Sequence, residues 1–228
     1  MKRNKNGNWD NKRRNRNPIP IGKAILMIYC GKCTEPEYFG DALKTIKENK
    51  EKASRGITKF IYKEKPLPVD PKSMAESVVS IMKSFGLPFD EVYVVFDKDS
   101  FKDDNFDNAV MMINNLNTSK DYHSTSFIPL WSNQCIELWF ILHFEYLQSK
   151  NERADYFDKL KELLNLKHKY RKNTKGIYAK VSSSRTKIND AIRNANKLLI
   201  LHKDESSFAN KFPATNVVEF FKKYKDSL

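Results

Sequence analysis

The sequence is poor in glycine and cysteine, and it lacks a long apolar run. Seven glycines among 228 residues exclude collagen-like and glycine-linker proteins. Three cysteines are too few for a disulfide framework. No run of about 18 apolar residues occurs, so no membrane-spanning helix is predicted. The basic N-terminus has no apolar stretch behind it and does not match a secretory signal. The expected compartment is therefore the cytoplasm.

Acidic residues are scarce relative to basic ones. The chain has 28 Asp and Glu against 41 Lys and Arg, which gives a formal net charge of +13. Such an excess favours a polyanionic partner, and nucleic acid is favoured over an anionic membrane. The chain is 40% hydrophobic and 12% aromatic, enough to bury a core, which argues against wholesale disorder.

The positive charge is concentrated in two segments. Residues 1–17 are rich in Lys and Arg, with Asp10 as the single acid, so we expect a flexible basic tail over residues 1–20. Residues 163–189 contain no acid at all. Their basic side chains include Lys169, Arg171, Lys172 and Lys180, interleaved with Tyr170 and Tyr178. Basic and aromatic side chains together suit a phosphate backbone with unpaired bases, although a solvated lysine-rich connection between helices would look the same.

Strand and helix patterns alternate along the first 130 residues. Strands are predicted at 24–30, 58–62, 91–97 and 125–130, with helices at 34–50, 73–85 and 104–116 between them. This order predicts an α/β fold with a mostly parallel four-stranded sheet flanked by helices. Four further helices are predicted at 134–148, 153–166, 186–201 and 215–226. The chain thus divides into a tail (1–20), an α/β core (21–130) and a helical extension packed on the core (131–228).

Acidic residues follow two of the predicted strands. Glu35 comes shortly after the first strand, and Asp97 and Asp99 close the third. Ligands of parallel α/β sheets bind at the carboxyl ends of the strands. In extended backbone, Asp97 and Asp99 would point to the same side. Clustered carboxylates suit Mg²⁺ or Mn²⁺, although acidic strand ends can also be simply solvated.

Four segments together resemble the RloB-like family in order and spacing. They are residues 31–39 (GKCTEPEYF), 94–99 (VVFDKD), 132–144 (SNQCIELWFILHF) and 213–217 (PATNV). Family members usually have proline where this chain has Gln134. The residues at 30, 32 and 33 also depart from the common Glu-Gly-x-x-Thr-Glu form. The family occurs in bacterial restriction and abortive-infection loci. It carries a Toprim core, the metal-binding fold of topoisomerases, primases and the "overcoming lysogenization defect" nucleases.

The resemblance implies roles for individual residues. Glu35 matches the single Toprim glutamate, and Asp97 and Asp99 match its paired aspartates. Related Toprim systems pair with an ABC-type ATPase, so a partner ATPase encoded nearby is implied, and oligomerisation is left open. Glu137, near the start of the predicted helix at 134–148, either adds a carboxylate beside the metal or satisfies backbone donors in the first helical turn.

These residues predict metal-dependent phosphodiester cleavage. Asp97 and Asp99 would be ligands, and Glu35 a further ligand or the general base. Lys32 and Lys98 are candidate phosphate contacts, with Lys169, Arg171, Lys172 and Lys180 beyond them. The expected function is a nuclease effector of anti-phage defence, acting on RNA, including tRNA, or on DNA. The alternatives are a non-catalytic Toprim scaffold that binds nucleic acid, a nucleotide or the ATPase, and a nucleotide-sugar enzyme that uses the Asp-x-Asp pair.

Other chemically capable residues are expected to be structural. His143 lies among apolar residues of a helix and is predicted to be a hydrogen-bonded core residue. Cys30 and Cys33 have C-x-x-C spacing, but no second such pair exists to complete a zinc site. The aromatic side chains Trp131, Trp139, Phe140, Phe144 and Tyr146 are predicted to belong to the core.

Overall fold

The computed structural model describes residues 21–67 and 69–228, so the predicted tail at 1–20 lies outside the described part. A five-stranded sheet has the order β2-β1-β3-β4-β5. The strands are β1 (Ile21–Tyr29), β2 (Lys59–Pro66), β3 (Glu91–Asp97), β4 (Ser126–Asn133) and β5 (Ala214–Thr215). The first four are parallel and β5 runs antiparallel to β4. The prediction of four strands is therefore corrected to five, because β5 is too short to leave a periodic pattern.

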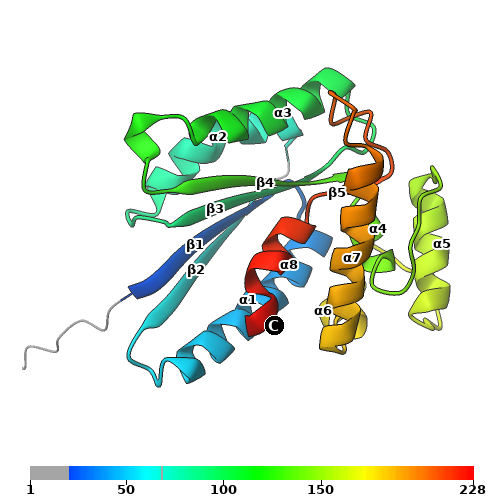
Figure 1. The fold of residues 1–228 in the computed structure, drawn as a ribbon, viewed down its shortest axis with the longest axis horizontal. Helices are drawn as coiled ribbons and strands as arrows, with labels where there is room; N and C mark the ends of the chain where they lie inside the picture. Colours follow the sequence, from blue (N-terminus) through cyan, green and yellow to red (C-terminus); the bar gives the residue numbers. More distant parts are fainter. Residues whose placement is uncertain (1–20, 68) are drawn as a thin grey trace, which may run out of the picture.

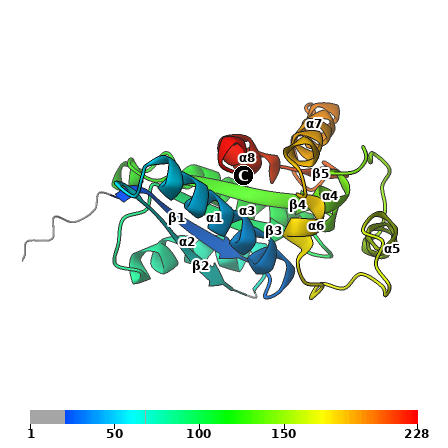
Figure 2. The ribbon, with the colours of Figure 1, turned by 90° about the horizontal axis from the view of Figure 1, so that it is seen from below.

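Helices cover both faces of the sheet (Figure 1). The α-helices are α1 (Thr34–Ala53), α2 (Pro71–Ser84), α3 (Asp103–Leu116), α4 (Glu137–Ile141), α5 (Arg153–Leu163), α6 (Ile177–Val181), α7 (Arg185–Leu201) and α8 (Val218–Tyr224). Two short 3₁₀ helices are η1 (Lys120–Tyr122) and η2 (Lys225–Ser227). Figures 1 and 2 show α2 and α3 on one face, and α1, α7 and α8 on the other.

The alternation of side chains along each strand creates two separate cores. In β3, Tyr93 and Val95 belong to the larger core beneath α1 and the C-terminal helices. Val94 and Phe96 belong to the smaller core beneath α2 and α3. All seven residues of β3 are buried, as expected for a parallel strand covered by helices on both faces. By the same alternation, Asp97 lies on the face of the sheet that α1 covers.

The C-terminal part of the chain contributes both to the sheet and to the larger core. Trp139 donates a 2.8 Å hydrogen bond from Nε1 to the hydroxyl of Tyr38 on α1, and its ring packs 4.9 Å from that of Phe221 on α8. The predicted helix at 134–148 is wrong in length, since α4 has only five residues. Asn133 ends β4, and a cis peptide bond joins it to Gln134.

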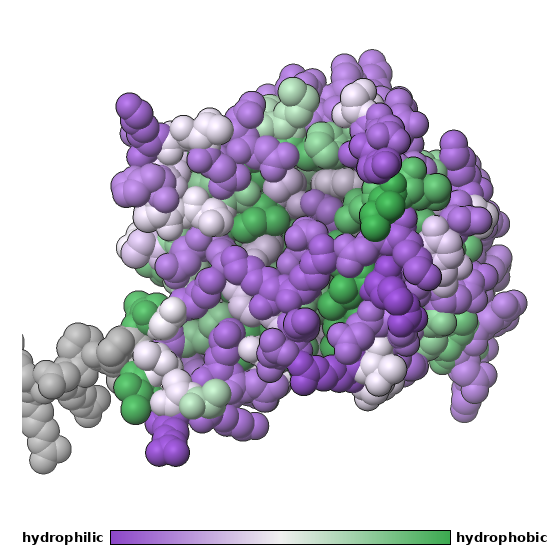
Figure 3. Space-filling view, viewed as in Figure 1, coloured by the Kyte–Doolittle hydropathy of each residue, from purple (hydrophilic) through white to green (hydrophobic). Residues whose placement is uncertain are grey.

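The outer surface of the C-terminal helices is mainly polar. Figure 3 shows hydrophilic residues over most of the face formed by α1, α7 and α8, broken by small apolar patches. Tyr146, predicted to be core, is 37% exposed, whereas Trp139 and Phe140 are fully buried as predicted. Within residues 21–67 and 69–228, no helix has the length and apolar content needed to cross a membrane.

Candidate functional site

A cavity of about 350 Å³ opens at the carboxyl edge of the sheet. The predicted acids Glu35, Asp97 and Asp99 all line it, and Lys172 of the predicted basic segment joins them. These residues come from separate stretches of sequence, and parallel strand pairing brings the ends of β1 and β3 to one edge. The three predicted acids therefore line one cavity, and their role as a shared metal site stays a prediction.

Glu35 reaches the cavity from the first turn of α1. Its carboxylate lies directly against the backbone of Gly31, where a Cβ atom on residue 31 would collide with Glu35 Oε2. The collision would be far inside van der Waals contact, so a side chain at position 31 would push the carboxylate away. The carboxylate of Glu35 can therefore lie in its observed position only because residue 31 is glycine.

Asp97 ends β3 and is only 6% exposed. Both of its carboxylate oxygens lack a hydrogen-bond partner among the described residues. Burial, and then the nearby charges of Glu35 and Glu137, raise the pKa of Asp97 well above its usual value, while Lys172 and Arg153 oppose the shift. A buried carboxylate without partners is costly, and a bound cation would remove that cost.

Asp99 reaches the cavity by a different geometry from the one predicted. Strand β3 ends at Asp97, and Asp99 has a φ of 45°, so the two side chains are not paired by extended backbone. The amide of Asp99 instead donates a 3.0 Å hydrogen bond to the carbonyl of Gln134. Its carboxylate forms an ion pair with the guanidinium of Arg153, the first residue of α5.

Glu137 is fully buried at the start of α4. Its Oε1 accepts a 3.2 Å hydrogen bond from the hydroxyl of Tyr170, and its Oε2 has no partner among the described residues. Burial raises its pKa, and a hydrogen bond from the thiol of Cys135 opposes the shift. Glu137 does not line the cavity, but its charge acts on Asp97.

The basic segment is tied to the first turn of α1. Thr34 Oγ1 donates a 2.8 Å hydrogen bond to the carbonyl of Lys172. Nearby, the carboxylate of Glu37 accepts from the amide of Gly176 at 2.9 Å and pairs with Lys175 Nζ at 2.5 Å. These contacts hold the segment beside Glu35. Tyr170, predicted as a stacking residue, is buried against Glu137 and presents no face to solvent.

The other predicted phosphate contacts lie in different settings. Lys32, Lys169, Arg171 and Lys180 do not line the cavity, and their side chains lie on the surface. The side chain of Lys98 is only 13% exposed, because its ammonium bonds to the carbonyl of Phe101 and pairs with Asp103 at 3.1 Å. Of these cations, Lys172 is the one that the fold places at the carboxylates.

Two charged residues near the cavity were missed by the sequence reasoning. Asp70 lines it as the N-cap of α2, accepting from the Ser73 amide at 3.1 Å and from Asn105 at 2.8 Å. Hydrogen bonds from Ser73 and Asn105 lower its pKa to about 2. The Asp-Pro sequence at 70–71 is a helix-start signal that could have identified this cap. For Arg153 no sequence signal existed, since only folding brings it to Asp99.

The cysteines and His143 are placed as structural residues. Cys30 lines the cavity and donates from Sγ to the carbonyl of Val69 at 2.6 Å, and burial raises its pKa to about 12. All three cysteines are free. His143 is buried, its Nδ1 lies 2.9 Å from the carbonyl of Trp139, and burial lowers its pKa to about 4.

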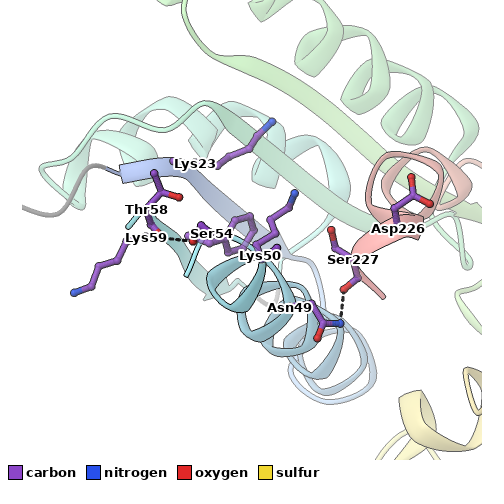
Figure 4. Close-up of a pocket in the computed structure, with 11 residues that line it drawn as sticks. Lys23, Asn49, Lys50, Ser54, Thr58, Lys59, Asp226 and Ser227 are labelled. Atoms are coloured by element: carbon purple, nitrogen blue, oxygen red, sulfur yellow. Dashed lines mark hydrogen bonds between the residues drawn. The ribbon is translucent and has the colours of Figure 1, made fainter. Parts of the chain in front are cut away.

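A larger hollow of about 480 Å³ lies at the opposite, amino edge of the sheet (Figure 4). Lys23, Lys50 and Lys59 line it, and Asn49 bonds across it to the carbonyl of Ser227 at 3.0 Å. None of the predicted catalytic residues reaches it. Although this hollow is larger than the cavity at the carboxyl edge, it is therefore the weaker candidate for a catalytic site.

The fit of a metal ion can be tested on the carboxylates themselves. Oxygen donors are the ligands that Mg²⁺ and Mn²⁺ prefer, and the free oxygens of Asp97 are suitably unpartnered. Within the described residues, no three acidic, histidine or cysteine side chains are yet grouped closely enough to hold an ion. Asp99, which was predicted as a ligand together with Asp97, is paired with Arg153. The donor chemistry fits a divalent ion, but Asp99 would have to leave Arg153 to complete the set.

The fold and this edge define an α/β protein with a mostly parallel sheet and an acidic cavity at its carboxyl end. The family model described as RloB-like protein matches residues 25–223. The chain therefore belongs to the RloB-like family, as its motifs indicated. No curated protein and no solved structure matches it.

Proposed function

We propose that this protein is a nuclease with a Toprim-type core, dependent on Mg²⁺ or Mn²⁺, that acts in anti-phage defence. Its substrate class is nucleic acid, either RNA, including tRNA, or DNA. The proposal is supported by the gathering of Glu35, Asp97 and Asp99 in one cavity with Lys172. Membership of the RloB-like family is consistent with it.

The observation that carries the proposal is the state of Asp97. A carboxylate that is buried, faces a cavity and lacks any hydrogen-bond partner among the described residues is expensive to maintain for folding alone. Two neighbouring acids, Glu35 and Glu137, make its ionised form less favourable still. Such an arrangement is typical of a site that awaits a cation.

The roles of the residues follow from their positions. When bound, a divalent ion would polarise the scissile phosphate and lower the pKa of an attacking water. Asp97 and Asp99 would hold the ion. Glu35 would either complete the ligand set or accept the proton from the water. Lys172, anchored through its own carbonyl, would contact a phosphate oxygen from the wall of the cavity.

A non-catalytic scaffold that binds nucleic acid, a nucleotide or an ATPase is the second candidate. The exposed cations at 167–175 favour it as much as they favour a nuclease. The free carboxylate oxygens of Asp97 favour the nuclease, because a phosphate-binding scaffold gains nothing from buried negative charge. An ABC-type ATPase encoded nearby is proposed as the regulatory partner for either form.

The test is phage restriction in cells that co-express the neighbouring ATPase. Glu35→Gln removes one charge from the cavity, and Glu48→Gln removes one from the exposed face of α1 as a matched control. We expect Glu35→Gln to abolish restriction and to leave tRNA and genomic DNA intact, while Glu48→Gln behaves as wild type. Full restriction by Glu35→Gln would overturn the catalytic proposal in favour of the scaffold.

A further inference from the structure

Arg153 is an unexpected cation at the proposed metal site. It is the first residue of α5, and its guanidinium pairs with the carboxylate of Asp99. The start of α5 is fixed by a reciprocal cap, in which Asp155 accepts from the amide of Glu152 at 2.9 Å. The cap therefore fixes the backbone of Arg153 at the start of the helix.

One member of this ion pair, Asp99, is also a proposed metal ligand. A carboxylate oxygen that is paired with a guanidinium cannot serve a divalent ion at full strength, because the two cations repel each other at that distance. A metal ion that binds Asp99 Oδ1 must therefore displace the guanidinium from that oxygen.

The guanidinium of Arg153 has N–H donors that make no hydrogen bond within the described residues. Its Nε has no hydrogen-bond partner among residues 21–67 and 69–228. The side chains of Arg153 and Asp99 are 33% and 21% exposed as wholes, but the paired atoms, Nη2 and Oδ1, are themselves buried. A planar fork of N–H donors beside a carboxylate cavity has the geometry that recognises a phosphate through two parallel hydrogen bonds.

We propose that Arg153 is a phosphate-binding residue of the active site, held on Asp99 until metal displaces it. This inference rests on the proposed function. In the free protein Arg153 neutralises Asp99. When a divalent ion takes the Asp99 oxygen, the released guanidinium binds a non-bridging oxygen of the nucleic-acid backbone. Metal and phosphate therefore bind cooperatively, since each ligand favours the same rearranged state.

If the exchange occurs, the single substitution Arg153→Gln should change two affinities in opposite directions. Without the guanidinium, Asp99 is free for metal at the outset, so Arg153→Gln should bind Mn²⁺ about tenfold more tightly than wild type. The same variant lacks the phosphate contact, so in saturating Mn²⁺ it should bind an oligonucleotide about tenfold more weakly. A surface ion pair with no role at the site would change neither affinity.

The experiment measures Mn²⁺ binding by calorimetry and then the binding of a labelled, cleavage-resistant 2′-O-methyl oligoribonucleotide by anisotropy. Arg193→Gln is the matched control, because it removes an exposed arginine that pairs with Asp190 on α7. Thermal melting of each variant checks that the fold is kept. Equal Mn²⁺ affinity, or equal oligonucleotide affinity, in Arg153→Gln and wild type overturns the exchange. Failure of every form to bind Mn²⁺ overturns the proposed metal site, and the exchange with it.

Discussion

The hydroxyl of Thr34 donates a 2.8 Å hydrogen bond to the backbone carbonyl of Lys172, which is 138 residues away in sequence. Thr34 is adjacent to Glu35 in the first turn of α1, and Lys172 lines the same cavity as Glu35. The bond therefore joins the carboxylate edge of the sheet to the basic segment. Together with the contacts of Glu37 to Lys175 and Gly176, this hydroxyl holds the proposed phosphate contact beside the proposed metal ligands.

Removing that hydroxyl should loosen the basic segment. Thr34→Val keeps the side-chain shape but leaves the Lys172 carbonyl without its donor, so the free energy of unfolding should fall by about 1 kcal/mol. Oligonucleotide affinity should fall with it, because Lys172 is no longer held at the cavity. Thr45→Val, which removes a bond within α1 to the carbonyl of Asp41, is the control. Equal oligonucleotide affinities in the two variants would show that the anchor has no role in binding.

The exposed cations beside the cavity should carry the salt dependence of nucleic-acid binding. The triple variant Lys169→Gln, Arg171→Gln, Lys172→Gln should weaken binding to all sequences, and should reduce the slope of log affinity against log salt by about two. The control triple variant Lys52→Gln, Lys83→Gln, Lys120→Gln removes the same charge from exposed positions toward the amino edge. If both triples change the slope equally, binding follows net charge and the segment has no specific role.

Glycine at position 31 should be required for function more than for stability. In Gly31→Ala the new Cβ would meet the carboxylate of Glu35, a flexible side-chain end that can move away at little cost to folding. Calorimetry should show weaker Mn²⁺ binding, with a melting temperature close to that of wild type. Gly40→Ala in α1 is the control, because its Cβ would meet Glu64, which lies outside the cavity. Wild-type Mn²⁺ affinity in Gly31→Ala would remove Glu35 from the ligand set.

The sequence allowed site residues to be predicted where they directly follow a strand. Apolar runs located β1 and β3, and parallel pairing then placed Glu35 and Asp97 at one edge. It was uninformative where contact depends on tertiary packing. Arg153 meets Asp99 only because α5 folds back onto the edge. The apolar run at 138–144 suggested a long helix, yet the chain turns after five helical residues, since apolar content fixes burial and not helix length.

The three cysteines should differ in reactivity. Burial raises the pKa of Cys30 to about 12 and also raises that of buried Cys135, so neither forms much thiolate at pH 8. Cys33 is exposed. Iodoacetamide at pH 8 should therefore modify Cys33 first, as read by peptide mass spectrometry. Faster labelling of Cys30 would mean that the cavity is more open to solvent than its burial indicates.

His143 should make stability depend on pH. Its pKa is about 4 in the fold against 6.5 when unfolded, so the folded state favours the neutral ring. This contribution is fully present above pH 6.5 and is lost as the pH falls toward 4, by about 3 kcal/mol in total. Urea unfolding at several pH values should show wild type losing stability relative to His143→Gln over this range. Parallel curves for the two proteins would contradict the burial of a neutral ring.

The proposed nuclease activity depends on Asp97. The most direct measurement is the integrity of tRNA and genomic DNA in phage-infected cells that express the protein with the proposed partner ATPase. Asp97→Asn keeps the size of the side chain and removes its charge, and Asp121→Asn does the same at an exposed position in η1. We expect fragmented nucleic acid with wild type and Asp121→Asn, and intact nucleic acid with Asp97→Asn. Fragmentation by Asp97→Asn at the wild-type level would contradict this expectation.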